Sequence, residues 1–216
     1  MNIVAESLFG KEQNTWLLHQ QTVPLQIQLN DPYTDYIYEE MRQCYIHCLD
    51  HGAIVASCVA LESVIKSTSY LKWFVENGSR EHNGELWNTI DNKKFYDSIE
   101  YALKIDLIST RLAERLHAFR DQVRNKYLHG ETPKEIKEAI WQDIGILNVK
   151  TGEIKVEDVK LKDAIHLQQL ARIKNDRELT PLVVKFVYEV ITVIYEKLEE
   201  VRRKFTGNAM NTASHE

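Results

Sequence analysis

Three residues in one short stretch, Arg124, Asn125 and His129, have the types and spacing expected of a site that handles a phosphate. If the stretch is helical, Asn125 and His129 lie one turn apart on one face. Arg124 is then about 100° round the helix from Asn125, close enough to reach a phosphate held over that face. An imidazole exchanges protons near neutral pH, whereas a guanidinium stays charged. The stretch therefore offers an acid–base group beside a fixed cation.

The sequence places His129 at the end of the predicted helix. Gly130 follows directly, as is usual for the residue just past a helix C-terminus, where the macrodipole favours a cationic imidazolium. Asp121 would extend the row of Asn125 and His129 by another turn. A surface helix end whose basic residues only complement the dipole has the same pattern, so the spacing by itself leaves both interpretations open.

Positive charge gathers around this stretch although the whole chain is acidic. The formal net charge is −5, which argues against broad, sequence-independent binding to nucleic acid. Between Ser109 and Glu131 the positive residues exceed the negative ones by two, five against three: Arg111, Arg115, Arg120, Arg124 and Lys126 against Glu114, Asp121 and Glu131. This distribution suits a small, local phosphate site.

Two predicted helices must position these residues. The first runs from about Thr110 to His129, and its apolar residues recur at spacings of three and four. The second, from about Ala53 to Val75, is apolar on most sides and is therefore expected at the centre of a bundle. Glu62 lies within this central helix, where a carboxylate either faces a basic partner such as Arg124 or points to solvent.

The remaining pattern predicts an all-α protein with a small β-hairpin. Only 8 Gly and 4 Pro interrupt the 216 residues, so long helices are expected. Further helices are predicted at Tyr33–Asp50 after Asp31-Pro32, at Lys94–Ile105, from Thr132-Pro133 through Ile136, Ile140 and Trp141, at Leu161–Asn175, and from Pro181, capped by Thr180, to about Phe205. Alternating apolar runs around Gly152 predict the hairpin over about 144–158. The expected organisation is an N-terminal arm (1–30), one helical domain (31–205) and a disordered tail (206–216).

The run Arg124-Asn125-Lys126-Tyr127-Leu128-His129 resembles the signature of the HEPN superfamily, helical domains prominent among prokaryotic toxin and defence ribonucleases. The resemblance covers about 31–130 and implies a bundle of four to five long helices that forms a homodimer with its motifs face to face. It implies an endoribonuclease that needs no metal or other cofactor, with Arg124, Asn125 and His129 as catalytic residues. Glu62, Arg120, Asp121 and Tyr127 would support the site or bind substrate.

The resemblance leaves several alternatives open. A HEPN-like domain that has lost catalysis would act as a dimerisation or ligand-binding module in a regulatory or defence complex. The expected partners are RNA, a second copy of the chain, and an antitoxin or defence-complex protein, with no membrane. Tyr127 suits stacking on an RNA base, but it also continues the apolar stripe of its helix.

A rival cluster of metal-ligand types lies on the first predicted helix, at Cys44, His47, Cys48 and His51. From Cys44 to His51 a helix rises about 10 Å, too far for one tetrahedral ion with bonds of about 2.0 to 2.3 Å. At most Cys44 and Cys48 would bind a metal together, and core packing explains them equally well. Three clustered cysteines form no disulfide framework, and no signal peptide or membrane-length apolar run is present, so a cytoplasmic location is expected.

Overall fold

The computed structural model describes residues 32–77, 83–130, 132 and 134–212, with side chains as far as Phe205. The predicted N-terminal arm lies outside these residues. The elements are α2 (Pro32–Ile46), α3 (Asp50–Glu76), α4 (Gly84–Asp91), α5 (Phe95–Lys104), α6 (Thr110–Phe119), the π-helical η1 (Arg120–Arg124), α7 (Asn125–Leu128), α8 (Lys134–Glu138), β1 (Ile140–Leu147), β2 (Ile154–Lys160), the 3-10 turn η2 (Leu161–Asp163) and α9 (Ile165–Thr212). The described chain is thus mostly helical with one small hairpin, as predicted.

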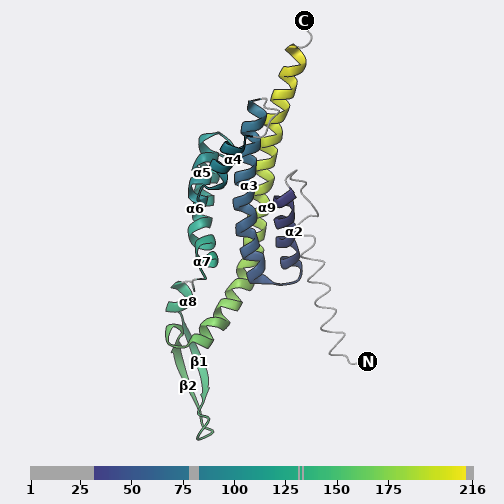
Figure 1. The fold of residues 1–216 in the computed structure, drawn as a ribbon. Coiled ribbons are helices and arrows are strands. Elements are labelled where there is room, and N and C mark those ends of the chain that lie inside the picture. Colours follow the sequence, from purple (N-terminus) through teal and green to yellow (C-terminus); the bar gives the residue numbers. More distant parts are fainter. Residues whose placement is uncertain (1–31, 78–82, 131, 133, 213–216) are drawn as a thin grey trace, which may run out of the picture.

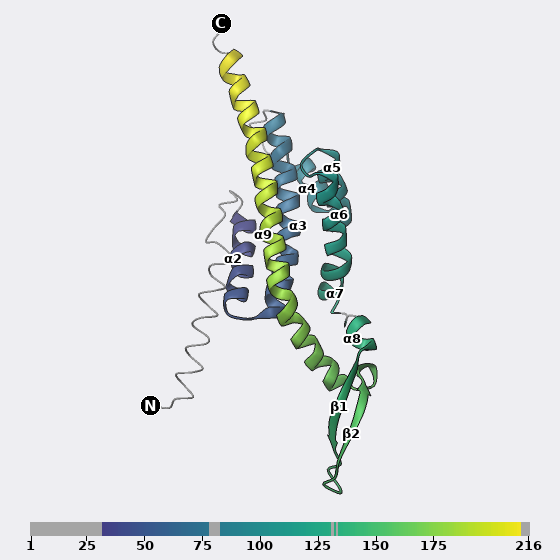
Figure 2. The same ribbon diagram turned by 180° about the vertical axis from the view of Figure 1, so that it is seen from behind.

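Helix α3 is the centre of the bundle. Figures 1 and 2 show α2, α9 and the layer of α5 and α6 arranged around it. Its apolar residues point in most directions, so they are satisfied only when other helices cover every side. Leu61, Val64 and Ile65 are fully buried there, in one continuous core with residues of α2, α5, α6 and α9. Among the described helices, α3 alone is long and apolar enough to cross a membrane, but 67% of its most apolar window is buried inside the protein.

Several helix boundaries differ from the prediction. Helix α2 begins at Pro32, as predicted, but it ends at Ile46 because Cys48 takes a left-handed backbone conformation with φ of 56°. The polar segment before Asn92 contains α4, whose first turn is capped by the Asn83 side chain. Helix α8 ends at Glu138, so Ile140 and Trp141 belong to β1 and not to the predicted helix.

The last two predicted helices are one continuous helix, α9, with Pro181 inside it. Thr180 does not cap a new helix; its hydroxyl donates to the carbonyl of Asp176, 2.6 Å away, within the same helix. Proline has no N–H and crowds the preceding turn, which bends a helix. Figure 1 shows the green N-terminal part of α9 running at an angle to the yellow remainder. The helix continues to Thr212, beyond its predicted end near Phe205 and into the predicted tail.

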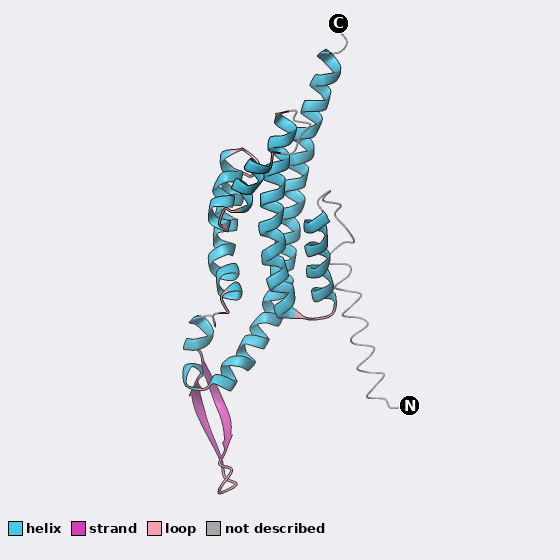
Figure 3. Ribbon diagram, viewed as in Figure 1, coloured by secondary structure: helices cyan, strands magenta, loops and turns pink. Residues whose placement is uncertain are grey.

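The predicted hairpin is confirmed and is longer at its base. Strands β1 and β2 are antiparallel, with Leu147 opposite Ile154 and a bulge between Trp141 and Ile144. Gly152, with φ of 73°, allows the tight turn between them. Figure 3 shows the hairpin, in magenta, projecting beyond the end of the helical bundle.

Core packing around α3 predicts a strong effect of Leu61→Ala. Leu61 is fully buried, so the substitution removes apolar contacts and leaves a cavity, and the free energy of unfolding should fall by about 2–5 kcal/mol. The matched control is Leu170→Ala on the exposed side of α9, expected to change it by less than about 1 kcal/mol. Urea unfolding followed by circular dichroism measures both, and equal effects would contradict the central position of α3.

Candidate functional site

The motif Arg124–His129 lies at the end of one continuous helical segment, the motif helix, which consists of α6, η1 and α7. The winding of this helix changes at η1. Ser109 caps α6 by accepting the backbone N–H of Leu112 at 3.3 Å. At η1 the winding becomes π-helical, so the N–H of Asn125 donates to the carbonyl of Arg120, five residues back. Such single π-turns are frequent at functional sites. The wider turn takes up one extra residue, and the carboxylate of Asp121, the first member of the predicted row, is paired with Arg120 at 2.7 Å.

Arg124 joins the motif helix to the central helix. One of its terminal nitrogens donates to the Glu62 carboxylate at 3.0 Å, and the other donates to the Asn125 side-chain oxygen at 3.3 Å. The guanidinium also lies over the ring of Phe95, with its central carbon 5.8 Å from the ring centroid. Of the two alternatives left open for Glu62, the structure shows the ion pair with Arg124. These contacts fix the plane of the guanidinium next to Asn125.

Glu62 is shared between two cations. Its second oxygen forms an ion pair with Lys66 Nζ, 3.2 Å away, and the same ammonium donates to the backbone carbonyl of Asp91 at 2.7 Å. Arg124, Lys66 and Glu62 together carry a net charge of about +1, counting one charge for each ionised group. Sequence reasoning missed Lys66, although its position four residues after Glu62 on a helix is a signal for such an ion pair.

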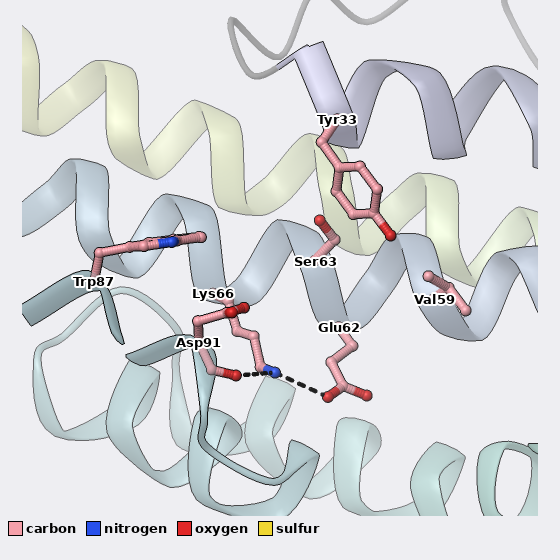
Figure 4. A pocket seen from close by; sticks show the side chains of 7 residues that line it. All are labelled: Tyr33, Val59, Glu62, Ser63, Lys66, Trp87 and Asp91. Carbon is pink, nitrogen blue, oxygen red and sulfur yellow. Dashed lines mark hydrogen bonds and ion pairs between the residues drawn. The ribbon is translucent and has the colours of Figure 1, made fainter. Parts of the chain in front are cut away.

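An open pocket of about 550 Å³ adjoins Glu62 on the side of Lys66. Its lining residues come from the start of α2, from α3 and from α4: Tyr33, Val59, Glu62, Ser63, Lys66, Trp87 and Asp91. Figure 4 shows Lys66 reaching across between Glu62 and the Asp91 carbonyl, with Tyr33 and Trp87 toward opposite ends. The Trp87 ring is held edge-on against Tyr70, with 5.5 Å between centroids. The pocket thus combines fixed aromatic surface with a positioned cation.

His129 ends the motif helix one turn after Asn125, as the spacing predicted. Its backbone N–H donates to the carbonyl of Asn125 at 3.3 Å, and Gly130 follows with φ of 66°. The carbonyl of Gly130 accepts a hydrogen bond from Arg172 of α9, 3.4 Å away. The residue is exposed, and its side chain makes no hydrogen bond or ion pair with another described residue. The backbone around the imidazole is therefore anchored while the ring faces solvent.

Tyr127 is part of the core and not an exposed stacking surface. Only 5% of its surface is exposed, its hydroxyl donates to the buried Asp176, and Asn175 donates to that hydroxyl at 3.3 Å. His51 reaches the other Asp176 oxygen at 3.4 Å. Burial raises the pKa of the Tyr127 hydroxyl, and the hydrogen bond to Asp176 raises it further. Tyr127 therefore supports the motif by tying α7 to α9. Sequence patterns gave no sign of Asp176 or His51 in this role.

The other two predicted supporting residues lie apart from this cluster. Arg120 donates to the Asp121 carboxylate at 2.7 Å and lies over the Tyr96 ring, 4.8 Å from its centroid. His117, next to them, pairs with Glu100 at 2.7 Å. Arg120 and Asp121 thus belong to a network on the outer side of α5 and α6, and none of the contacts above joins them to Arg124 or His129.

The four candidate metal ligands, Cys44, His47, Cys48 and His51, do not lie on one helix. Helix α2 ends at Ile46 and α3 begins at Asp50, so Cys44 and His51 lie on different helices. Cys48 is exposed in the turn between them and Cys44 is half-buried. Among the described residues, no group of three or more His, Cys, Asp or Glu side chains is placed to hold a metal ion.

Glu62, Arg124, Asn125 and Lys66 thus form one connected cluster, with an exposed imidazole at the end of the same helical segment. Comparisons with protein-family models, with curated proteins and with solved structures give no match. Function is therefore inferred from the chemistry of this cluster.

Tyr127→Phe should loosen the end of the motif helix. It removes a buried hydrogen bond to a carboxylate, which costs about 1–3 kcal/mol of unfolding free energy at neutral pH. Because the folded state raises the pKa of this hydroxyl above its unfolded value of about 10, its contribution is fully present below about pH 10 and is lost as the pH rises further. Urea unfolding of both proteins between pH 7 and 11 tests this. The difference between them should shrink above pH 10, and a constant difference would contradict the assignment.

Proposed function

We propose that this protein is a metal-independent endoribonuclease of the HEPN type, with a composite site formed by two copies of the chain. The observation that carries the proposal is the orientation of Arg124 by Glu62 beside Asn125, one turn before the exposed His129. A guanidinium held in a fixed plane suits a phosphate group, and an exposed imidazole suits proton transfer to and from ribose and the leaving oxygen.

The reaction consists of one nucleophilic attack on phosphorus and two proton transfers. His129 of one copy takes the proton of a ribose 2'-hydroxyl, and the 2'-oxygen attacks the neighbouring phosphorus. The bond to the 5'-oxygen breaks, and the protonated His129 of the partner subunit donates to that oxygen. The products are a 2',3'-cyclic phosphate and a 5'-hydroxyl. Arg124 stabilises the charge that gathers on the phosphate in the transition state, and Asn125 holds a non-bridging oxygen or orients the imidazole.

Substrate binding would use the cluster and its pocket together. The net positive charge of Arg124, Lys66 and Glu62 attracts the phosphate that is cut, although the chain as a whole is acidic. A base next to the cut would stack on Trp87, since base–aromatic stacking works with any sequence. Activity that requires two copies needs control of assembly, and a toxin–antitoxin or phage-defence setting, with a partner that blocks the site, fits such a cytoplasmic enzyme.

A second function rests on the same ion pair. Glu62 neutralises Arg124 and links α3 to the motif helix, which is also what a purely structural salt bridge does. In that case the protein would be a catalytically inactive HEPN-like module that binds a ligand or dimerises in a defence or regulatory complex. Replacing His129 distinguishes the two functions. An endoribonuclease should lose RNA cleavage, whereas an inactive module cleaves no RNA with or without His129.

His129→Ala and Arg124→Ala should each lower RNA cleavage by about 10²–10⁴-fold, because each removes one acid–base or electrostatic contribution. The measurement is cleavage of a labelled single-stranded RNA, with the same sequence in DNA as a substrate that lacks the 2'-hydroxyl. Exposed residues away from the motif give matched controls, namely His47→Ala and Arg203→Ala, which should retain full activity. Undiminished cleavage by His129→Ala would contradict the mechanism, and no cleavage by the wild-type dimer would favour the inactive module.

Glu62→Gln separates orientation from stability. It keeps the shape of the side chain but removes the charge that holds Arg124, so kcat should fall by about tenfold or more with a smaller change in KM. The unfolding free energy should fall by roughly 1–2 kcal/mol, as for other hydrogen-bonded charged groups that lose a partner. If Glu62 has a structural role only, the stability will fall while kcat of the folded enzyme stays unchanged.

A further inference from the structure

One face of the projecting hairpin carries large apolar side chains into solvent. Leu147 is directly opposite Ile154, and Val156, opposite Gly145, lies two residues along on the same face. Their exposed fractions are 55%, 70% and 60%, respectively. An isolated two-stranded hairpin gains little stability in water, and clustered exposed apolar residues usually mark a binding surface. The hairpin therefore has the properties of an interface.

Strand β2 also has a free edge in the described part of the chain, where β1 is its only strand partner. Unpaired N–H and C=O groups along such an edge are ready to bind another strand. Figures 1 and 2 show the hairpin beyond the bundle, with both strands clear of α2 and α3. A second strand thus has room to approach β2.

The charges along β2 are complementary to those of a second β2. Lys155 and Glu157 lie on the face opposite to Val156, and their side chains are paired at 2.8 Å within one chain. If two β2 strands pair antiparallel with Val156 opposite its own copy, each Lys155 lies opposite Glu157 of the partner subunit. Registers centred on Lys155 or on Glu157 would instead place like charges opposite each other, which is destabilising. In β1, Asp143 is the only charged residue, so that edge offers no such pairing.

We propose that β2 is an interface between two copies of this chain, which join edge to edge into a four-stranded antiparallel sheet centred on Val156. The two-fold arrangement uses each β2 edge once, so this interface joins only two copies. Val156 then packs against Val156 of the partner subunit, with Ile154 diagonal to it and directly opposite Asp158 of the partner subunit. An edge lysine ordinarily opposes strand pairing, but here Glu157 of the partner subunit would neutralise it. Antiparallel pairing places the two helical bundles at opposite ends of the sheet, so this interface is separate from the one that would bring two His129 side chains together. It does not depend on the proposed ribonuclease activity.

Charge reversal on the full-length chain tests the interface. Lys155→Glu and Glu157→Lys each replace two attractive cross-strand pairs with two repulsive ones, so the dissociation constant of the dimer should rise about tenfold or more. Sedimentation velocity at low ionic strength measures this constant without RNA. Glu153→Lys, a reversal just outside β2, is the matched control and should change it by less than about twofold. Circular dichroism confirms that each variant is folded.

Mixing the two single variants distinguishes pairing between chains from pairing within one chain. A Lys155→Glu chain carries two glutamates and a Glu157→Lys chain carries two lysines, so neither regains its internal ion pair, but together they restore both cross-strand pairs. The mixture should form a heterodimer with about wild-type affinity. The proposal is overturned if single reversals leave the dimer unchanged, if the mixture fails to recover, or if Glu153→Lys weakens the dimer as much as Glu157→Lys.

Discussion

The burial of α3 on all sides is the constraint on which the rest of the structure depends. A helix that is apolar in most directions must be covered by α2, α9 and the α5–α6 layer at once. A charged residue in the middle of α3 then meets a neighbouring helix instead of water. Glu62 is such a residue, and a partly buried carboxylate requires a cation. Arg124 and Lys66 satisfy that requirement, so core packing and the candidate site share one ion-pair cluster.

Contacts with α9 hold the end of the motif helix in place. Val123 and Tyr127 continue the buried stripe of α6 at a spacing of four residues. Tyr127 is then held by Asp176, and the carbonyl of Gly130 by Arg172. These contacts fix the backbone on both sides of His129 while its ring stays in solvent. An anchored backbone with a free imidazole is the arrangement that a positioned proton donor or acceptor requires.

The hairpin differs from the bundle because its own chain does not cover it. Its base is partly buried at Trp141 and Val159, whereas the outer part of β2 exposes Ile154 and Val156. The bundle satisfies its apolar surface within one chain, and the hairpin leaves part of that surface for another strand. The exposed hairpin surface and the candidate site thus lie in different parts of the molecule, joined by the short α8 segment.

The sequence by itself predicted the helical class, the hairpin and the position of His129 at a helix end, and it limited Glu62 to two alternatives, a basic partner such as Arg124 or solvent. These follow from local periodicity, from turn residues such as Gly152 and from the cost of an unpaired carboxylate in an apolar helix. Only the tertiary structure decided that Pro181 lies inside a bent helix, because packing along α3 outweighs the local preference of proline for a helix start. Only the tertiary structure also shows the π-helical turn at Arg120–Arg124 and the hydrogen bond from Tyr127 to Asp176. Both arise from contacts between residues far apart in the chain, which periodicity along one helix does not contain.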